Sequence, residues 1–343
     1  MREINYNTQP RLNLSLDSIA LLLYCGELVD IDEPSMSQKE WLELEKKLKH
    51  SQIKRPAGLL SLAFEAIMIN LDIEEELAMR ITLFNKRLSK LLEQLLNLEM
   101  LGVLVTTKYE QNYPINLKLK LKKHTPLILY YTGNIQLLYD DMVCVAGPIK
   151  STRRIDQNTR QLVMKLCKES LTLISCGNRG VEKFSIKQQL KYGGKVVDFI
   201  CGNIIQEMKE YAKPLKNGQM LMMSAHHPLA SFDLVHAIDR NQYVFILSKA
   251  SIIMHSQINS GAVWLVAMQN FSQKWTKLVA IMDDEFYGNA RLVEHGAIGL
   301  TMDMLELDIP LFDLIEQDKE HIVEKETYDQ LSIYQFLGEE NGK

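Results

Sequence analysis

The sequence predicts an α/β fold in which a doubly wound parallel, Rossmann-like sheet follows an N-terminal helical domain. Six short apolar runs occur after residue 113, with helix-length stretches between most of them. The runs lack polar alternation, as expected for strands that helices cover on both faces. The chain has 343 residues, more than one hydrophobic core usually serves. We therefore expect a helical domain over residues 1–105, a Rossmann-type domain over 106–302 and an acidic C-terminal tail over 303–343.

The first third of the chain has the apolar spacing of helices. A row of apolar residues recurs at spacings of three and four and predicts one amphipathic helix that ends before Gly102. Residues 16–23 and 59–70 are also apolar and helix-like, with a polar break over residues 30–35 between them. The row consists of Ile81, Phe84, Leu88, Leu91, Leu95 and Leu98.

The later apolar runs predict the strands of the parallel sheet. Each run is rich in Val, Ile, Leu or Met and is bounded by glycine or polar residues. The carboxyl ends of such strands meet at one edge of the sheet, where ligands bind in this class of fold. The predicted strands are Met142–Val145, Leu171–Ile174, Lys195–Ile200, Met220–Met223, Ile252–Met254 and Leu278–Ile281.

Composition indicates a globular protein of the cytoplasm. Hydrophobic residues make up 46% and charged residues 24%, and no stretch offers the roughly 18 uninterrupted apolar residues that a membrane span needs. The N-terminus lacks the features of a secretory signal. The five cysteines are odd in number and never form C-x-x-C, so we expect reduced, buried thiols and no metal site.

Charge is unevenly distributed along the chain. From Lys150 to Lys216 there are 14 Lys/Arg against 6 Asp/Glu, although the whole chain has a net charge of −4. Such a block attracts polyanions, or else consists of the solvated faces of surface helices. From Asp303 onward there are 12 Asp/Glu against 3 Lys/Arg. This acidic tail can fold onto the basic block, dock on a partner or remain a solvated helix.

Short motifs after residue 112 occur in an order that is typical of one family. Y-P-I-N-L at residues 113–117 and P-L-I-L-Y-Y-T-G-N at 126–134 form a paired entry segment. Loops that begin at Gly147 and Ser175 follow the first two strands, and G-G-K-V-V follows at 193–197. R-N-Q at 240–242, S-G at 260–261 and G-N-A-R-L-V-E-H-G-A at 288–297 complete the series. In this order the motifs resemble the DprA/Smf family.

The sequence departs from the family pattern at several polar positions. Pro148 and Ile149 replace a Ser and an Arg, Glu182 stands for Asp, Ile186 for His, and Gln242 for a second Arg. The winged helix that family members often carry at the C-terminus is also missing. These departures favour a relative recruited into antiphage defence over an ordinary competence protein.

The resemblance implies a non-catalytic Rossmann-type protein that binds single-stranded DNA and needs no cofactor. It also implies a homo-oligomer, with a RecA-type recombinase as a protein partner and a role in antiphage defence or in DNA recombination and uptake. Two alternatives remain. The chain can be the antitoxin that neutralises a phosphoribosyltransferase-like toxin in a defence toxin–antitoxin pair, or it can sense a nucleotide ligand.

The candidate binding residues follow from phosphate chemistry as well as from the resemblance. Glycines after the apolar runs let the backbone approach an anion, and helix N-termini there favour phosphates, although the same glycines also suit tight turns alone. Basic residues beside these loops can contact a sugar-phosphate backbone. The predicted DNA- or ligand-binding residues are Gly147, Lys150, Thr152, Arg153, Arg154, Ser175, Arg179, Gly180, Lys183, Arg240, Asn241, Ser260, Gly261 and Asn289.

Several residues are open to a structural as well as a functional interpretation. Arg240 offers bidentate phosphate contacts, and Asn241 can cap a helix or contact a ligand. Phe184, Tyr192 and Phe232 can stack on bases, but such aromatics more often belong to a core. The adjacent His226 and His227 lack a ligand-spaced Cys, Asp or Glu, and no catalytic motif occurs, so we expect neither a metal site nor an enzyme.

Overall fold

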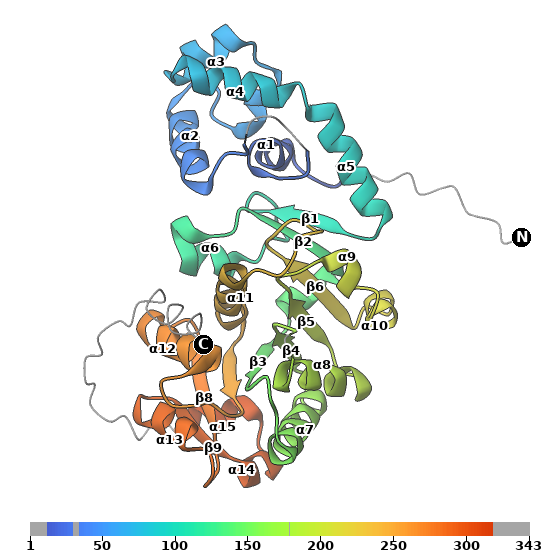
Figure 1. Cartoon of the computed structure of the whole chain (residues 1–343), viewed down its shortest axis with the longest axis vertical. Coiled ribbons are helices and arrows are strands. Elements are labelled where there is room, and N and C mark those ends of the chain that lie inside the picture. The colour runs from blue at the N-terminus through green and yellow to red at the C-terminus, as the bar shows by residue number, and fades with distance from the viewer. Residues whose placement is uncertain (1–11, 30–33, 178, 318–343) are drawn as a thin grey trace, which may run out of the picture.

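The computed structural model describes residues 12–29, 34–177 and 179–317, and these contain a nine-stranded sheet (Figure 1). The strand order is β1-β2-β6-β5-β4-β3-β7-β8-β9, and every pairing from β6 to β9 is parallel. The predicted doubly wound α/β fold is confirmed. The strands are β1 (Leu104–Thr107), β2 (Ile128–Gly133), β3 (Met142–Ala146), β4 (Thr172–Ser175), β5 (Val196–Phe199), β6 (Met220–Ser224), β7 (Ala250–Ile253), β8 (Lys277–Met282) and β9 (Ile298–Thr301).

Three strands were not predicted from the sequence, and all three lie toward the edges of the sheet. β1 and β2 add an antiparallel pair beside β6, and β9 ends the sheet beyond β8. β1 and β9 are edge strands, which bury fewer of their side chains and so carry a weaker apolar signal, whereas β2 has five buried residues of six and was overlooked despite its apolar run. In β9, for example, only Leu300 is buried.

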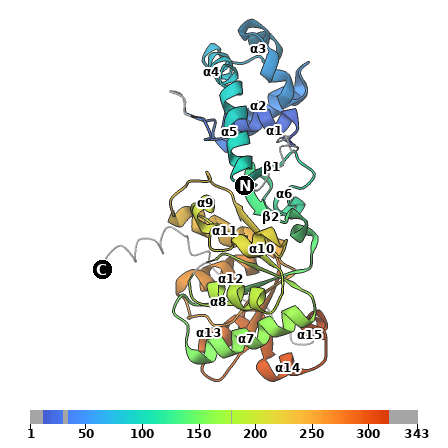
Figure 2. The ribbon, with the colours of Figure 1, turned by 90° about the vertical axis from the view of Figure 1, so that its right-hand side faces the viewer.

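Helices cover both faces of the sheet. One face carries α7 (Arg153–Lys168), α8 (Val181–Lys191), α9 (Ile204–Glu207) and α10 (Ala212–Lys216), and Figure 2 views the molecule from this side. The other face carries α6 (Ile115–Leu121), α11 (Leu234–Leu247), α12 (Gly261–Gln273) and α13 (Tyr287–Glu294).

The alternation of side chains along the strands divides the core of the sheet into two layers. In β3, Val143 and Val145 join the cluster under α7 and α8, whereas Cys144 and Ala146 join the cluster under α11 and α12. In β3 to β7 every residue is buried, so neither face of these strands is left to solvent. This two-sided burial explains why the predicted strands are continuous apolar runs.

The N-terminal helices stack against the β1–β2 end of the sheet (Figure 1). Ser37 and Glu40 form a capping box at the second helix. Hydrogen bonds from Ser15 to Glu110 and an ion pair of 2.8 Å between Lys108 and Glu45 link the helices to the sheet. The helices are α1 (Leu16–Cys25), α2 (Gln38–His50), α3 (Phe64–Leu71), α4 (Glu75–Asn85) and α5 (Leu88–Met100), with a 3₁₀ turn at Pro56–Ser61.

The single amphipathic helix predicted over residues 81–98 is wrong, because the chain breaks between α4 and α5. Arg87 leaves the helical region of backbone space, and its N–H bonds to the Phe84 carbonyl three residues back. The break lets both helices contact α1, with Ile81 and Leu91 buried. The run over residues 59–70 is likewise divided, between the 3₁₀ turn and α3.

The first part of the acidic tail is folded. It forms α14 (Met302–Glu306) and α15 (Leu311–Gln317), whose residues Leu305, Leu311 and Leu314 are buried in the α7 layer. Asp308 pairs with Lys168 at 2.8 Å, so part of the tail does contact the basic block. The rest of the tail lies outside the described residues. The domain limits at residues 105 and 302 stay predictions.

Candidate functional site

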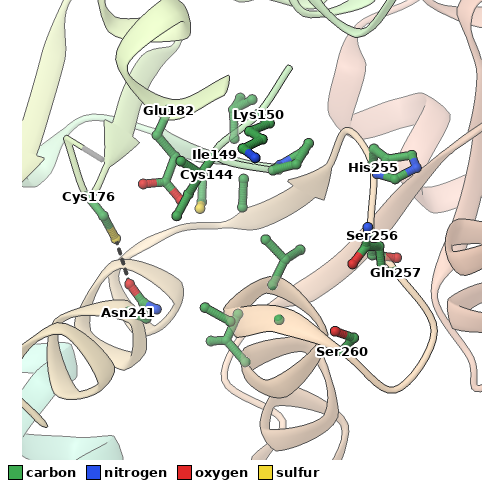
Figure 3. A pocket seen from close by; sticks show the side chains of 18 of the residues that line it. Cys144, Ile149, Lys150, Cys176, Glu182, Asn241, His255, Ser256, Gln257 and Ser260 are labelled. Carbon is green, nitrogen blue, oxygen red and sulfur yellow. Dashed lines mark hydrogen bonds between the residues drawn. The ribbon is translucent and has the colours of Figure 1, made fainter. Parts of the chain in front are cut away.

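A pocket lies where the strand order changes direction. β3 neighbours β7, while the chain leaves β3 for β4 on the other side, and ligands bind at this edge of doubly wound sheets. The cavity has a volume of about 290 Å³. Loops after β3, β4 and β7, together with α11, form its walls (Figure 3). The lining includes Cys144, Gly147, Pro148, Ile149, Lys150, Cys176, Glu182, Asn241, Phe245, His255, Ser256, Gln257, Ser260, Gly261 and Val263.

Three helices begin at this edge of the sheet. Thr152 caps α7 by accepting a hydrogen bond from the Ile155 N–H at 3.3 Å. Ser260 occupies the cap position of α12 without a side-chain hydrogen bond to the helix, and Gly180 precedes α8. The positive ends of three helix dipoles therefore surround the pocket.

Two of the predicted glycines bring the first two loops together. Gly180 has φ +73°, and a Cβ at this position would lie 2.2 Å from the Pro148 carbonyl oxygen. A Cβ at Gly147 would lie 2.8 Å from the Val181 side chain. Only glycine permits this approach, so both residues shape the wall of the pocket through loop packing.

The interior of the pocket combines apolar walls with one carboxylate. Glu182 is 9% exposed, and Figure 3 shows its carboxyl group turned toward the cavity. Val145, Phe245 and Val263 supply apolar surface. Burial lowers the pKa of His255, which therefore stays neutral at neutral pH. Lys150 is the basic residue of the lining, and it is exposed.

Arg240 lies behind the pocket wall and is 4% exposed. Its guanidinium donates hydrogen bonds to Cys201 Sγ at 3.0 Å and to Asn241 Oδ1 at 3.4 Å. The same Asn241 oxygen accepts a hydrogen bond from Cys176 Sγ at 3.2 Å. Arg240 is thus enclosed by protein in this structure, and what the structure places in the pocket is its neighbour Asn241.

Asp198 is buried beside this network. Burial raises the pKa of its carboxyl group to about 7, although the positive charge of Arg240 opposes that rise. Within the described residues, Asp198 Oδ1, Arg240 Nε and Ser175 Oγ are buried without a hydrogen-bond partner. Buried polar groups normally have hydrogen-bond partners. Several buried polar atoms in this region lack one among the described residues, which is typical of functional sites.

The predicted basic residues divide into two groups. Lys150 lines the pocket, Arg153 begins α7 three residues later, and Arg179 lies in the loop before α8. All three are exposed and form no ion pair within the described residues. Arg154 pairs instead with Asp283 at 2.7 Å and with Glu285. Lys183 pairs with Glu210 at 2.8 Å.

The remaining predicted residues have structural surroundings. Asn289 is fully buried and donates hydrogen bonds to the carbonyls of Ile253, Met254 and Ile281, so it ties α13 to β7 and β8. Ser175 is buried at the end of β4. Ser260 and Gly261 line the pocket, and their contact with a ligand stays a prediction.

The aromatic candidates do not gather at the pocket lining. Phe184 packs under the guanidinium of Arg160, and Tyr192 lies after α8, near the opposite edge of the sheet. Phe232 is 64% exposed in the loop before α11. His226 stacks on His236 with ring centroids 3.4 Å apart.

Several residues that line the pocket were not predicted as binding residues from the sequence. Glu182 was identified only as a replacement within a motif, and Cys176, Ser256 and Gln257 were not singled out. The last two follow the β7 run directly, which is a usable signal because carboxyl ends of parallel strands carry ligand-binding loops.

Two further structural features bear on function. Within the described ranges, no group of three or more His, Cys, Asp or Glu side chains is placed to hold a metal ion. A search of the same residues finds no helix that is both long and apolar enough to cross a membrane.

The fold and the pocket define a class of protein, a doubly wound α/β chain with a ligand pocket at its strand switch point. Within that class the family is shown by the sequence. The family model for DNA recombination-mediator protein A matches residues 104–306, which is more than half of the chain. The chain belongs to this family, and the resemblance to DprA/Smf is confirmed.

A search of solved structures finds several similar chains, and the first of them agrees with the fold. DNA processing protein A from Streptococcus pneumoniae is 20% identical, and the match covers 80% of this chain and 99% of that one with a TM-score of 0.55. A structure on single-stranded DNA binding by DNA processing protein A from Helicobacter pylori is 20% identical over 57% of this chain and 90% of that one, with a TM-score of 0.47. A molybdenum cofactor binding protein from Rippkaea orientalis is 13% identical over 52% and 96%, with a TM-score of 0.36. No curated protein matches the sequence.

Proposed function

We propose that this chain is a non-catalytic recombination-mediator-type protein that binds single-stranded DNA at the carboxyl edge of its sheet. The observation that carries the proposal is that three helices begin at the edge of the sheet that holds the pocket, beside three exposed cations that pair with no acidic residue of the described ranges. Helix dipoles and Lys/Arg side chains are the groups that hold phosphodiesters. Family membership supports the same ligand.

The reactive groups near the pocket favour binding over catalysis. Burial raises the pKa of the Cys176 thiol well above its ordinary value, so the thiol stays protonated and is a poor nucleophile. Asn241 Oδ1 accepts its hydrogen bond, and an amide does not act as a general base. The pocket can therefore position a ligand without offering an activated nucleophile.

A titration with single-stranded and duplex oligonucleotides of the same sequence tests the proposal. Fluorescence anisotropy across a salt series should show tighter binding of the single strand, with affinity falling steeply as salt rises because phosphate contacts release counterions. The oligonucleotide should be recovered intact. Equal or absent binding of both forms at low salt would contradict the proposal.

The biological role and the protein partners of the chain go beyond DNA binding and are separate proposals. A role in antiphage defence, a RecA-type recombinase or a toxin as protein partner, and assembly as a homo-oligomer all stay predictions. One surface favours a protein partner, because Leu229 and Phe232 in the loop before α11 and Val235 in its first turn are each more than half exposed. Purification of the full chain together with the proteins that neighbouring genes encode would distinguish a toxin partner from a recombinase.

A further inference from the structure

A second cavity lies between α8 and α10, on the face of the sheet that Figure 2 shows. Its volume is about 380 Å³, and Lys187, Lys191 and Lys213 line it, so we call it the lysine groove. Gln219 also lines the groove and directly precedes β6. The groove therefore lies near the amino ends of the strands, at the opposite edge of the sheet from the candidate DNA-binding pocket.

The lysine groove is positively charged. Lys183, Lys187 and Lys191 are spaced by four residues and form a row along one face of α8. Lys191 and Lys213 are exposed and pair with no acidic residue of the described ranges. Like charges four residues apart on a helix repel each other. An anion that binds in the groove gains attraction and also relieves this repulsion.

Glu210 shows which kind of anion fits on the lysine row. Its carboxylate pairs with Lys183 at 2.8 Å and with Lys187 at 3.4 Å. The hydrogen bond from Lys183, with the positive charges of both lysines, lowers the pKa of Glu210, which is therefore ionised at neutral pH. A single side-chain carboxylate is thus accommodated here. The longer contact leaves Lys187 free to exchange Glu210 for an incoming carboxylate, while Lys183 retains it.

The groove also has apolar surface, but it lacks an aromatic platform. Leu190 and Pro214 belong to the lining and are partly exposed. Tyr211, the aromatic residue of the lining, is only 6% exposed. It offers no face for a stacked base, which sites for single-stranded nucleic acid usually provide. Lysines around a small apolar surface suit a peptide in which acidic side chains surround an apolar one.

We propose that the lysine groove binds an acidic segment of a partner protein. Carboxylates of that segment pair with Lys187, Lys191 and Lys213, and an apolar side chain packs on Leu190 and Pro214. Lysine suits this role because its ammonium group binds single carboxylates as a point charge, without the bidentate geometry of arginine. The interaction is independent of the proposed function, since the groove and the DNA-binding pocket lie at opposite edges of the sheet.

The test measures binding of a labelled peptide of about ten residues, in which glutamates surround a Leu-Phe pair, to the full chain by fluorescence anisotropy. Peptides with glutamine for glutamate, or with serine for the apolar pair, should bind more weakly. Lys191→Ala/Lys213→Ala should weaken binding of the acidic peptide about fivefold through the loss of two exposed ion pairs. Lys46→Ala/Lys90→Ala, at exposed positions in α2 and α5, should keep the wild-type affinity.

Glu210→Gln should have the opposite effect. It frees Lys187 from its internal partner, so affinity for the acidic peptide should rise about twofold. No binding of the acidic peptide, or equal affinities of the wild type and the groove double variant, would overturn the proposal. Equal losses of peptide and oligothymidylate affinity in that variant would make the groove a nucleic-acid surface and would also reject it.

A last variant tests whether the acidic end of this chain itself occupies the groove. Glu324→Gln/Glu326→Gln removes two of its carboxylates from the full chain and should leave the affinity for the acidic peptide unchanged. A rise in affinity would assign the groove to the chain's own acidic end and reject a partner segment.

Discussion

Two regions of the molecule use the same basic stretch of sequence in opposite ways. Along the seam between α7 and α14–α15, Lys165 donates to the carbonyls of Leu307 and Ile309 and pairs with Glu169. At the pocket edge, Lys150 and Arg153 form no ion pair within the described residues. At the seam the charged side chain has partners within the protein. Beside the pocket the charged side chains face solvent and are available to a ligand. A local excess of charge therefore indicates function only where the fold leaves that charge unpaired.

The incomplete pairing continues behind the pocket. Asp198 and Arg240 are both buried, and each has a polar atom without a hydrogen-bond partner among the described residues. Lys165 is equally buried at the seam, yet it has several partners. Substitutions in the two regions should consequently differ in the sign of their effect on stability, not only in size.

The largest effect is expected at the seam. Lys165→Met keeps the length of the side chain but leaves two carbonyls and Glu169 without their donor. Breaking one partner of a buried pair costs about 3–5 kcal/mol, so the free energy of unfolding should fall by about 4 kcal/mol in urea denaturation. Lys168→Met, which removes only an exposed ion pair with Asp308, should leave the free energy of unfolding close to that of the wild type. An equal loss in the free energy of unfolding in both variants would contradict the expected difference between the buried Lys165 and the exposed Lys168.

The second effect should have the opposite sign. The pKa of Asp198 rises from 3.8 to about 7 through burial, so its contribution to stability is present below pH 3.8 and is lost as pH rises toward 7. About two of the three pH units of this pKa rise lie above pH 5, and each pH unit changes the free energy of unfolding by about 1.4 kcal/mol. Between pH 5 and pH 8 the wild type should lose about 2–3 kcal/mol relative to Asp198→Asn.

Chemical denaturation at both pH values measures this difference. Asp284→Asn, at an exposed position after β8, serves as the control and should track the wild type. A constant difference between Asp198→Asn and the wild type from pH 5 to pH 8 would show that Asp198 is satisfied in the folded protein.

The sequence predicted the central strands well and the edges poorly. Runs such as residues 142–145 are apolar throughout because both of their faces are buried, whereas β1 is an edge strand with a partly exposed face. The acids that pair with Arg154 lie about 130 residues further on, so only the fold shows that this cation is occupied. The burial of Arg240 was unpredictable for a similar reason, since it depends on which face of α11 packs against the sheet.

The loops of the site were predictable because parallel strands end at one edge. Gly147, Ser260 and Gly261 do line the pocket. The direction of the Glu182 side chain could not be read from spacing, because the first turn of a helix points its side chains into the protein, along a loop or outward, according to how the preceding loop packs. Here Gly180 fixes that packing.

Two charge-matched double variants test most directly whether the cations beside the pocket hold single-stranded DNA. Lys150→Ala/Arg153→Ala removes two exposed charges that pair with no acid in the described part of the chain, whereas Lys168→Ala/Lys277→Ala removes two exposed charges that pair with Asp308 and Glu316. Loss of two single-strand phosphate contacts should reduce the slope of log affinity against log salt by about 1.4 and weaken binding about tenfold at low salt. The seam variant should keep the wild-type slope. Identical salt curves for the two variants would contradict single-stranded DNA binding at the carboxyl edge of the sheet.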